Sequence, residues 1–410
     1  MKTHIEMNII FLSINVPAGE KRDFIAYNFI EKEMGELSRR GHNVYFLTEN
    51  KKKDLDINGI KYLSVGTRLE KNRLIRRIKN SLFALRHLGQ YWHCLIINPR
   101  GTVGICGVER ALDKIIASKG INVVHTHFFY PEGDNGVVAA KKHNVPVVAT
   151  LRGAELYNRP ELSYGAMRGD FYKIMAKQST RKVDYFTVPN KFLLDKLVSL
   201  FNISSEKVEY LPNGVQLEIV KQLRVKDRNG NMLKLISIGR LIKRKNHILL
   251  IEAAELFRDE SVDLTIIGEG PELGYLREAI EHRGLKNVRI VDEMSKEELL
   301  ELMSAYDCLV QPSLIEGMPN VVLESLSLGI PCLVSNIPGH REVIRENYNG
   351  FLFDPYQKSD LCSKIRRILE IKHSLEDMRE NCRDTARRFT LEKKIDRYLE
   401  IYQALTSKGR

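Results

Sequence analysis

Two glutamates in the second half of the chain stand on either side of a Gly-Met-Pro-Asn loop and are separated by seven residues. Pro319 occupies the place where the first helical position is expected, so the loop should run into a helix whose free N–H groups can bind phosphate. Glu316 precedes this helix and can bind sugar hydroxyls, whereas Glu324, two turns in, can reach a ribose diol. The alternative is that Glu316 only caps the helix and that Glu324 lies on the surface. The pattern favours a site for a sugar joined to phosphate, formed by Glu316, Gly317, Met318, Pro319, Asn320 and Glu324.

A basic loop earlier in the same half could supply the positive charge that a diphosphate needs. Gly239 follows an expected strand and lets the backbone approach a ligand closely. Arg240 offers a two-pronged donor, and Lys245 offers a point charge on a flexible stem. Open α/β sheets bind ligands at the carboxyl ends of their strands. These three residues therefore predict a diphosphate site, the alternative being a solvated basic loop.

A glycine-rich segment, Ile267-Gly-Glu-Gly-Pro-Glu-Leu-Gly274, is close to a dinucleotide-binding fingerprint. Its spacing is G-x-G-x-x-x-G, one residue too long, and it opens the second βα unit of its half rather than the first. We therefore expect Gly268 and Glu269 to belong to a loop that approaches a nucleotide closely, and not to an NAD site.

Two histidines end an expected strand in the first half, in Val123-Val-His-Thr-His127. Residues i and i+2 of a strand point to the same side, which could indicate a metal site. No third ligand stands nearby in the sequence, so we do not expect zinc. A buried structural histidine is the alternative, and it fits His125 better than His127.

The elements that must position these residues alternate between strands and helices along the whole chain. Expected strands cover residues 8–13, 42–48, 123–125, 147–150, 185–188, 208–211, 234–238, 263–267, 287–291, 308–311 and 331–334. Expected helices include residues 24–40, 109–119, 191–201, 247–257, 272–283 and 297–305. Short Val- and Ile-rich strands are typical of parallel sheets buried on both faces. The alternation predicts two doubly wound α/β domains.

The length of 410 residues also favours two domains. We place the first domain at 1–215, a polar linker at 216–231 and the second domain at 232–385. The charged helical pattern of 386–410 should pack back onto the first domain. No apolar run approaches the roughly 20 residues of a membrane span, and six scattered cysteines without a C-x-x-C pair are typical of a reducing cytoplasm.

Four motifs together identify a family. Glu316-x7-Glu324, the Gly-Arg-Leu-x3-Lys loop at 239–245, Ile-Gly-Glu-Gly-Pro at 267–271 and Asn213-Gly-Val215 resemble the retaining glycosyltransferases of family 4. The resemblance runs over most of the chain and is dense from about Val123 to Phe353. It implies the GT-B fold, in which two Rossmann-like domains face each other across a cleft.

The resemblance also implies roles for individual residues. Arg240 and Lys245 would stabilise the departing diphosphate, Glu316 would hold the donor sugar and Glu324 the ribose. His127 would bind the transferred sugar or stabilise positive charge through its backbone. No metal or other cofactor is expected. The implied activity is retaining transfer from a nucleotide sugar, with a UDP-sugar as the expected donor, to a saccharide or polyprenyl-linked acceptor in cell-surface polysaccharide synthesis.

Three positions depart from the family pattern or vary within it. Asn246 replaces a frequent glycine, which a small polar residue should tolerate. Val16-Pro-Ala-Gly19-Glu20 has one glycine where many members have Gly-Gly-x-Glu, so only some backbone approach at Gly19 is expected on the acceptor side. Thr150-Leu-Arg-Gly-Ala-Glu155 is similar to a variant in surface-polysaccharide and teichuronic-acid enzymes. It would place Arg152 near the acceptor, the alternative being a structural ion pair.

The net positive charge of the chain lies entirely in its first half. Residues 1–200 hold 32 Lys and Arg against 19 Asp and Glu, whereas residues 201–410 hold 32 against 33. Such asymmetry indicates an anionic partner. No nucleic-acid recognition motif is present, so nucleic acid is not expected.

Residues 71–88 have the pattern of a basic amphipathic helix that either lies on an anionic membrane or packs against the core. Asp54-Leu-Asp56 has the metal-binding D-x-D pattern, but we interpret it as a turn.

The sequence therefore predicts a cytoplasmic glycosyltransferase that can act peripherally at the inner face of the membrane. A sugar-nucleotide epimerase of the same fold would instead turn over the donor without an acceptor. A non-catalytic nucleotide-sugar-binding protein is the third alternative, and the complete set of Arg240, Lys245, Glu316 and Glu324 argues against it.

Overall fold

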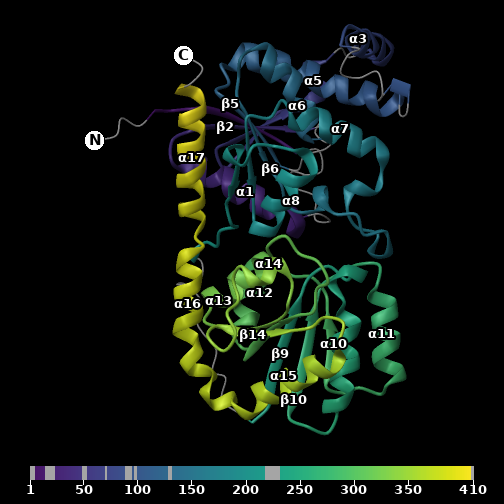
Figure 1. The fold of residues 1–410 in the computed structure, drawn as a ribbon, viewed down its shortest axis with the longest axis vertical. Coiled ribbons are helices and arrows are strands. Elements are labelled where there is room, and N and C mark those ends of the chain that lie inside the picture. Colours follow the sequence, from purple (N-terminus) through teal and green to yellow (C-terminus); the bar gives the residue numbers. More distant parts are fainter. Residues whose placement is uncertain are drawn as a thin grey trace. The chain divides into compact units, whose positions relative to one another are not determined.

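The computed structural model describes residues 5–13, 24–48, 53–69, 72–87, 95–96, 99–127, 132–217 and 231–407. The chain divides into two compact units (Figure 1). The first comprises Met1–Leu211 and Ile395–Arg410, and the second comprises Pro212–Lys394.

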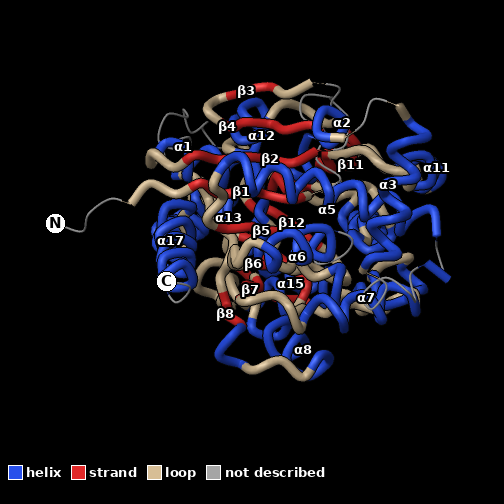
Figure 2. Tube along the Cα trace, turned by 90° about the horizontal axis from the view of Figure 1, so that it is seen from above, coloured by secondary structure: helices blue, strands red, loops and turns tan. Residues whose placement is uncertain are grey.

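The first unit is built on an eight-stranded sheet in the order β3-β4-β2-β1-β5-β6-β7-β8, which Figure 2 shows strand by strand. All neighbours are parallel except β3 and β4. The strands are β1 (Asn8–Leu12), β2 (Asn43–Thr48), β3 (Leu55–Ile57), β4 (Ile60–Ser64), β5 (Val123–His127), β6 (Val147–Thr150), β7 (Tyr185–Val188) and β8 (Val208–Tyr210). Their side chains are buried almost throughout β1, β2, β5, β6 and β7, as expected for a sheet with helices on both faces.

Helices of the first unit lie on both faces of this sheet, with α1 and α17 on one side and α5 and α6 on the other (Figure 2). The α-helices are α1 (Phe24–Arg39), α2 (Val65–Arg68), α3 (Arg73–Arg86), α5 (Pro99–Lys119), α6 (Glu132–Lys142), α7 (Asp170–Thr180), α8 (Lys191–Phe201) and α17 (Leu391–Ser407). Short 3-10 helices are η1 (Ala154–Leu156), η2 (Pro160–Leu162), η3 (Ala166–Arg168) and η4 (Ser205–Lys207).

The second unit has a six-stranded, fully parallel sheet in the order β11-β10-β9-β12-β13-β14. Its strands are β9 (Leu233–Ile238), β10 (Val262–Ile267), β11 (Val288–Val291), β12 (Cys308–Gln311), β13 (Cys332–Ser335) and β14 (Gly350–Phe353). Its α-helices are α10 (His247–Ala254), α11 (Leu273–His282), α12 (Lys296–Met303), α13 (Asn320–Ser327), α14 (Pro338–Arg341), α15 (Lys358–Glu370) and α16 (Met378–Arg388). The 3-10 helices are η5 (Lys243–Lys245), η6 (Glu255–Phe257) and η7 (Lys372–Asp377).

The unit boundaries differ from the predicted ones. The C-terminal segment of the first unit begins at Ile395, later than the predicted Ala386. Ala386 and Phe389 pack into the core of the second unit. Val215 also belongs to the second unit, where its N–H donates to the Phe389 carbonyl. Most of the predicted linker at 216–231 lies outside the described residues.

The interpretation of Asp54-Leu-Asp56 as a turn is wrong. Leu55–Ile57 forms strand β3, which pairs antiparallel with β4. The turn follows it, at Asn58-Gly59, where both residues have positive φ angles of 53° and 78°. Asn-Gly is the preferred pair for a two-residue hairpin because both residues tolerate this region. The Asp54 carboxylate accepts hydrogen bonds from Ser64, Thr67 and Arg68 and therefore stabilises the hairpin and helix α2.

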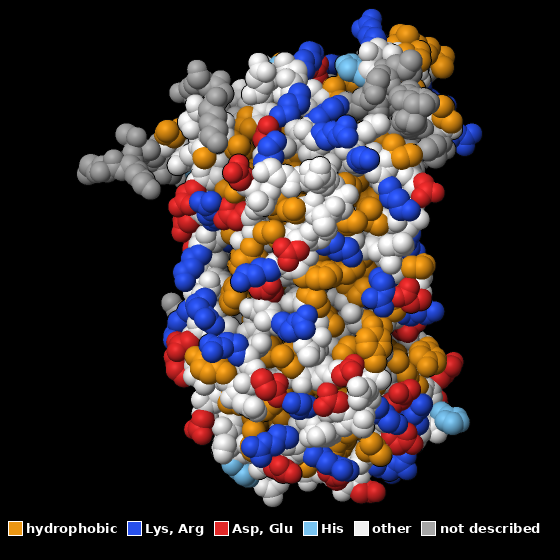
Figure 3. Space-filling model, viewed as in Figure 1, with side chains coloured by type: hydrophobic (Ala, Val, Ile, Leu, Met, Phe, Trp, Pro, Cys, Tyr) orange, Lys and Arg blue, Asp and Glu red, His pale blue; other side chains and the backbone are white. Residues whose placement is uncertain are grey.

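Helix α3 covers most of the predicted basic helix at 71–88. The structure contradicts the core-packed alternative, because the apolar side chains of this pattern are 49–67% exposed: Leu74, Ile78, Leu82 and Leu85. Figure 3 shows hydrophobic side chains on the surface in the region of α3, with Lys and Arg side chains nearby. In the described part of the chain, no helix is both long enough and apolar enough to span a membrane.

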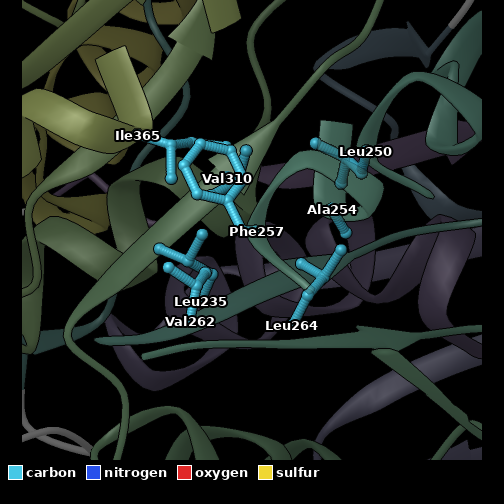
Figure 4. A pocket seen from close by; sticks show the side chains of 8 residues that line it. All are labelled: Leu235, Leu250, Ala254, Phe257, Val262, Leu264, Val310 and Ile365. Atoms are coloured by element: carbon cyan, nitrogen blue, oxygen red, sulfur yellow. The ribbon is translucent and has the colours of Figure 1, made fainter. Parts of the chain in front are cut away.

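The core of the second unit contains a small void between α10, α15 and the sheet (Figure 4). The side chains around it are apolar: Leu235, Leu250, Ala254, Phe257, Val262, Leu264, Val310 and Ile365. Because all of them belong to the hydrophobic core or its lining and carry no polar group, we interpret the void as a packing gap rather than a ligand site.

Candidate functional site

The loops after β9 and β10 are joined backbone to backbone. The Gly239 N–H donates to the Ile267 carbonyl at 3.0 Å, and the Leu241 N–H donates to the Glu269 carbonyl at 2.8 Å. Gly268 stands where an added Cβ would overlap the carbonyl oxygen of Gly239. The absence of a side chain at Gly268 thus allows the two loops to meet.

We expect Gly268→Ala to destabilise the second unit by about 1–3 kcal/mol, because the overlap forces a backbone shift. Chemical denaturation of both proteins measures the difference. Gly274→Ala is the matched control, because nothing lies within 4 Å of the added Cβ in α11, and a helical glycine replaced by alanine gains roughly 0.5–1 kcal/mol. Equal stability of the Gly268 variant and the wild type would contradict the close approach of the two loops.

Lys245, Arg244 and Glu316 form a compact ionic cluster in the second unit. Lys245 Nζ lies 2.6 Å from Glu316 Oε1, and an Arg244 Nη lies 3.3 Å from the same oxygen. Arg244 also donates to the Ile315 carbonyl at 3.2 Å, which fixes the loop after β12. Asn246, the replacement for the frequent glycine, has a left-handed φ of 57° that asparagine tolerates, and it leads directly into α10. The structure therefore brings the predicted Lys245 and Glu316 together and adds Arg244.

The carboxylate of Glu316 stays ionised despite its burial. Burial alone would raise its pKa, but the charges of Lys245 and Arg244 outweigh this effect and lower the pKa to about 2. The alternative that Glu316 only caps the helix does not fit, since α13 has no side-chain cap and Pro319 is its N-cap residue. Pro319 therefore lies one position before the predicted one.

Two fully buried histidines, His247 and His340, accompany this cluster. Burial lowers the pKa of His247 to about 3, with a further decrease from Lys245. Burial also lowers the pKa of His340 to about 4, although Glu316 opposes the shift. The Nδ1 of His340 donates to the Ser335 carbonyl at 2.8 Å, so its proton position is fixed by β13. Both rings are neutral at pH 7, and the charge at the site comes from Lys245, Arg244 and Glu316.

The burial of the neutral His247 and His340 rings predicts that the fold is less stable at acid pH. Between pH 6.5 and about pH 4 the unfolded chain protonates both histidines and the folded chain does not, so stability falls as the pH decreases through this range. At pH 5 the loss is about 2 kcal/mol for each ring relative to pH 8. His340→Asn should reduce the pH 8 to pH 5 loss by that amount in urea unfolding. His282→Asn, at an exposed histidine of α11, should leave it unchanged. An unchanged loss in His340→Asn would contradict the neutral buried ring.

Asn213 holds the loop before α13, a role that the sequence did not reveal. Its side-chain amide donates to the Met318 carbonyl at 2.8 Å and to Asn320 Oδ1 at 2.9 Å. Gly214, next to it, leaves room for the backbone of Leu391. The family motif at 213–215 therefore fixes the Met318–Asn320 backbone at the start of α13, where a helix offers N–H groups to anions.

Glu324 is buried within α13, which contradicts the alternative that it is a surface residue. Lys296, the first residue of α12, forms an ion pair with it. No motif pointed to Lys296, which is 28 positions earlier in the sequence.

Arg240 is not part of the ionic cluster of Lys245, Arg244 and Glu316. It is exposed and, among the described residues, makes no hydrogen bond or ion pair. Its charge acts on Glu293, whose pKa is raised overall because burial and the charge of Glu269 outweigh the lowering effect of Arg240. The guanidinium is thus available to an anionic ligand, beside the Glu269 loop.

In the first unit, His127 lies in a buried ionic network. An Arg152 Nη donates to His127 Nδ1 at 3.1 Å and to Glu33 Oε1 at 2.9 Å. Because Arg152 can only donate, Nδ1 accepts, and the ring proton is on Nε2, which lies 3.3 Å from Glu33 Oε2. The Arg152 guanidinium also stacks on Phe29 at 4.1 Å. The structural ion pair foreseen for Arg152 is present, and the acceptor role stays a prediction.

His125 and His127 point to the same side of β5, as expected, with ring centroids 4.7 Å apart. His125 is a structural histidine: Nε2 lies 2.7 Å from Thr150 Oγ1, and Nδ1 bonds to the Tyr402 hydroxyl of α17. Thr150 Oγ1 in turn lies 3.0 Å from the Tyr398 hydroxyl. Helix α17 is therefore tied to the strand that carries His127.

Gly19, predicted on the acceptor side, lies outside the described residues. Among the residues that the structure describes, no three His, Cys, Asp or Glu side chains are grouped to hold a metal ion.

Comparison with known proteins identifies the family to which the chain belongs. The family model "Glycosyltransferase Family 4" matches residues 29–219, and "Glycosyl transferases group 1" matches residues 219–406. An Escherichia coli UDP-Gal:alpha-D-GlcNAc-diphosphoundecaprenol alpha-1,3-galactosyltransferase is 26% identical over 306 residues, which cover 71% of this chain and 78% of the relative. TuaC of Bacillus subtilis strain 168, named for teichuronic acid biosynthesis, is 27% identical over 255 residues, or 60% of this chain and 61% of the relative.

The fold has solved counterparts. The crystal structure of a glycosyltransferase from Rickettsia africae superposes with a TM-score of 0.75 at 18% identity, and the match covers 98% of each chain. The predicted architecture of two Rossmann-like units is confirmed. The two family models together span the chain from residue 29 to residue 406, so the protein is a glycosyltransferase of family 4 with the GT-B fold.

Proposed function

We propose that the chain transfers a sugar from a nucleoside-diphosphate sugar, with the donor bound by the second unit. The observation that carries this proposal is the buried, ionised Glu316, which Lys245 and Arg244 hold at the carboxyl edge of the sheet. A carboxylate fixed in this way can accept hydrogen bonds from sugar hydroxyls, and the cations beside it can pair with phosphate.

In this mechanism, the glycosidic bond to the diphosphate breaks and the leaving group gains negative charge. Lys245, Arg240 and the N–H groups at the start of α13 stabilise this charge where it develops. Glu316 holds the donor sugar. Glu324 binds the ribose once the ammonium group of Lys296 releases an oxygen of the Glu324 carboxylate. These cations supply the electrostatic stabilisation, so we propose transfer without a metal ion.

We further propose that the configuration at the anomeric carbon is retained, with the acceptor hydroxyl attacking from the face that the diphosphate leaves. No carboxylate was evident in the sequence as a nucleophile on the acceptor side. NMR of the product measures the configuration. Inversion, or a trapped glycosyl-enzyme, would contradict front-face attack.

The acceptor and the cellular role are proposed from the relatives. The galactosyltransferase relative is named for a UDP-sugar donor and a diphosphoundecaprenol-linked acceptor, and TuaC is named for teichuronic acid. We propose a UDP-sugar donor, a saccharide or polyprenyl-linked acceptor bound by the first unit with Arg152, and a role in cell-surface polysaccharide synthesis at the inner face of the membrane.

A thermal-shift screen with UDP-, GDP- and ADP-sugars tests the donor assignment. We expect one UDP-sugar to stabilise the wild type, and Arg240→Ala and Glu316→Ala to lose most of that shift. Lys243→Ala, which removes an exposed cation of turn η5, should keep it. If no nucleotide sugar raises the melting temperature, the donor proposal fails. Turnover of the donor without an acceptor, and without hydrolysis, would indicate the epimerase instead.

A further inference from the structure

Helix α3 presents its apolar side chains to solvent. Leu74, Ile75, Ile78, Leu82 and Leu85 are between 45% and 67% exposed. Their spacing places them on one continuous face of the helix.

The opposite face of α3 attaches the helix to the protein through polar contacts. Asn80 is buried there, and its amide donates to the Val103 carbonyl at 3.1 Å. Its Oδ1 accepts from Arg110 at 2.6 Å, and Ala84 packs beside it. A core-packed amphipathic helix buries its leucines and exposes its polar residues. Helix α3 instead buries only Asn80 and Ala84 and leaves its leucines and isoleucines exposed, so five large apolar side chains are available to another partner.

The charges of α3 indicate what that partner is. Residues 73–86 contain five basic side chains and no acidic one. Arg77 borders the apolar face on one side, and Lys79 and Arg86 border it on the other, as the helical periodicity requires. Long basic side chains at the edges of an apolar face can reach up to lipid headgroups while the leucines enter the acyl boundary. Five Lys and Arg side chains around an apolar helix face are the combination that an anionic lipid surface attracts, because the lipid charge and the acyl boundary each bind one part of the helix.

We propose that α3 is a membrane-docking helix that lies in the plane of an anionic lipid surface, with Leu74, Ile78, Leu82 and Leu85 inserted. The buried Asn80 fixes the helix on α5, so the apolar face is preformed and no folding is needed on binding. The proposal rests on α3 alone and does not depend on the donor site, which is in the second unit. Nucleotide-sugar binding and membrane binding can therefore fail separately.

Vesicle co-sedimentation of the full chain tests it, with vesicles of phosphatidylcholine containing 30% phosphatidylglycerol and with pure phosphatidylcholine. We expect binding to the anionic vesicles and at least about 10-fold weaker binding to the neutral ones, since each basic residue near the surface adds about 1 kcal/mol. Ile78→Ser/Leu82→Ser/Leu85→Ser should weaken binding to the anionic vesicles by roughly 100-fold or more. Each leucine or isoleucine inserted into the membrane contributes about a factor of ten to the binding constant. Arg77→Gln/Lys79→Gln should remove most of the preference for anionic lipid.

Leu200→Ser/Leu256→Ser is the matched control, because these leucines are exposed to a similar extent, 46% and 50%, on other helices. It should bind vesicles like the wild type, and all variants should keep the nucleotide-sugar thermal shift of the wild type. Vesicle binding that the triple serine variant leaves intact would overturn the proposal. Absence of vesicle binding would also overturn it, and a dimer that the triple variant dissociates would then identify a second copy of the chain as the occupant of this face.

Discussion

Replacing Lys245 by alanine is expected to slow sugar transfer by about 10²–10³-fold in kcat, the range observed when one preorganised donor is removed from developing charge. Lys245 Nζ is 2.6 Å from Glu316, and both side chains are only 11% exposed, so water cannot easily replace the lost cation. The loss has two parts. The leaving diphosphate loses a counter-charge, and Glu316 loses the partner that keeps it ionised.

The second part has its own signature in the pH dependence. The pKa of Glu316, now about 2, should rise when Lys245 is removed, because burial then acts against the charge of Arg244 alone. Protonation of Glu316 would reduce donor binding, so the acid limb of the pH–rate profile should move to higher pH in Lys245→Ala. Initial rates of the wild type and the variant between pH 4 and pH 8, at saturating acceptor, measure this shift.

Lys243→Ala provides the control, since Lys243 belongs to the same turn η5 and carries the same charge but is exposed. Its kcat should stay within a factor of about two, because an exposed cation in high dielectric contributes little. Equal losses in Lys243→Ala and Lys245→Ala would mean that the turn acts only through its net charge. That result would contradict a specific role for the pair of Lys245 and Glu316.

Local chemistry made much of the second unit predictable. The strand ends before Gly239 and Gly268, and the loop before α13, could be located because short Val- and Ile-rich runs are followed by glycine or proline. The sequence could not show which charges meet. Lys296 pairs with Glu324, and Asn213 bonds to Met318 across 105 positions, and both contacts depend on the tertiary packing of segments that are distant in the sequence.

The first unit shows the same limit more clearly. The amphipathic pattern of α3 was visible in the sequence, but periodicity cannot tell which face of a helix is buried. That depends on Asn80, whose partner Arg110 lies 30 positions away on α5. By contrast, the Asn58-Gly59 turn was a local signal that was available and missed.

Replacing Arg152 by methionine is expected to destabilise the first unit by about 3–5 kcal/mol, because buried Glu33 would lose its cation. Glu33 is 2% exposed, and Arg152 lies 119 positions further along the chain. Glu33→Gln/Arg152→Met removes both charges and should recover most of that stability. Urea unfolding measures both effects. Lys142→Met, which breaks an exposed pair with Asp113 in the same unit, should change stability by less than about 1 kcal/mol.

The double variant also separates the two interpretations of Arg152. If Arg152 serves only the ion pair with Glu33, the stable double variant should transfer sugar with the kinetic constants of the wild type. We expect instead that its KM for the acceptor rises by about 10-fold or more while the nucleotide-sugar thermal shift is unchanged, because a lost charged hydrogen bond costs roughly 1.5–3 kcal/mol. An unchanged KM in a stably folded double variant would assign Arg152 to the fold alone. The acceptor would then have to be bound by other residues of the first unit.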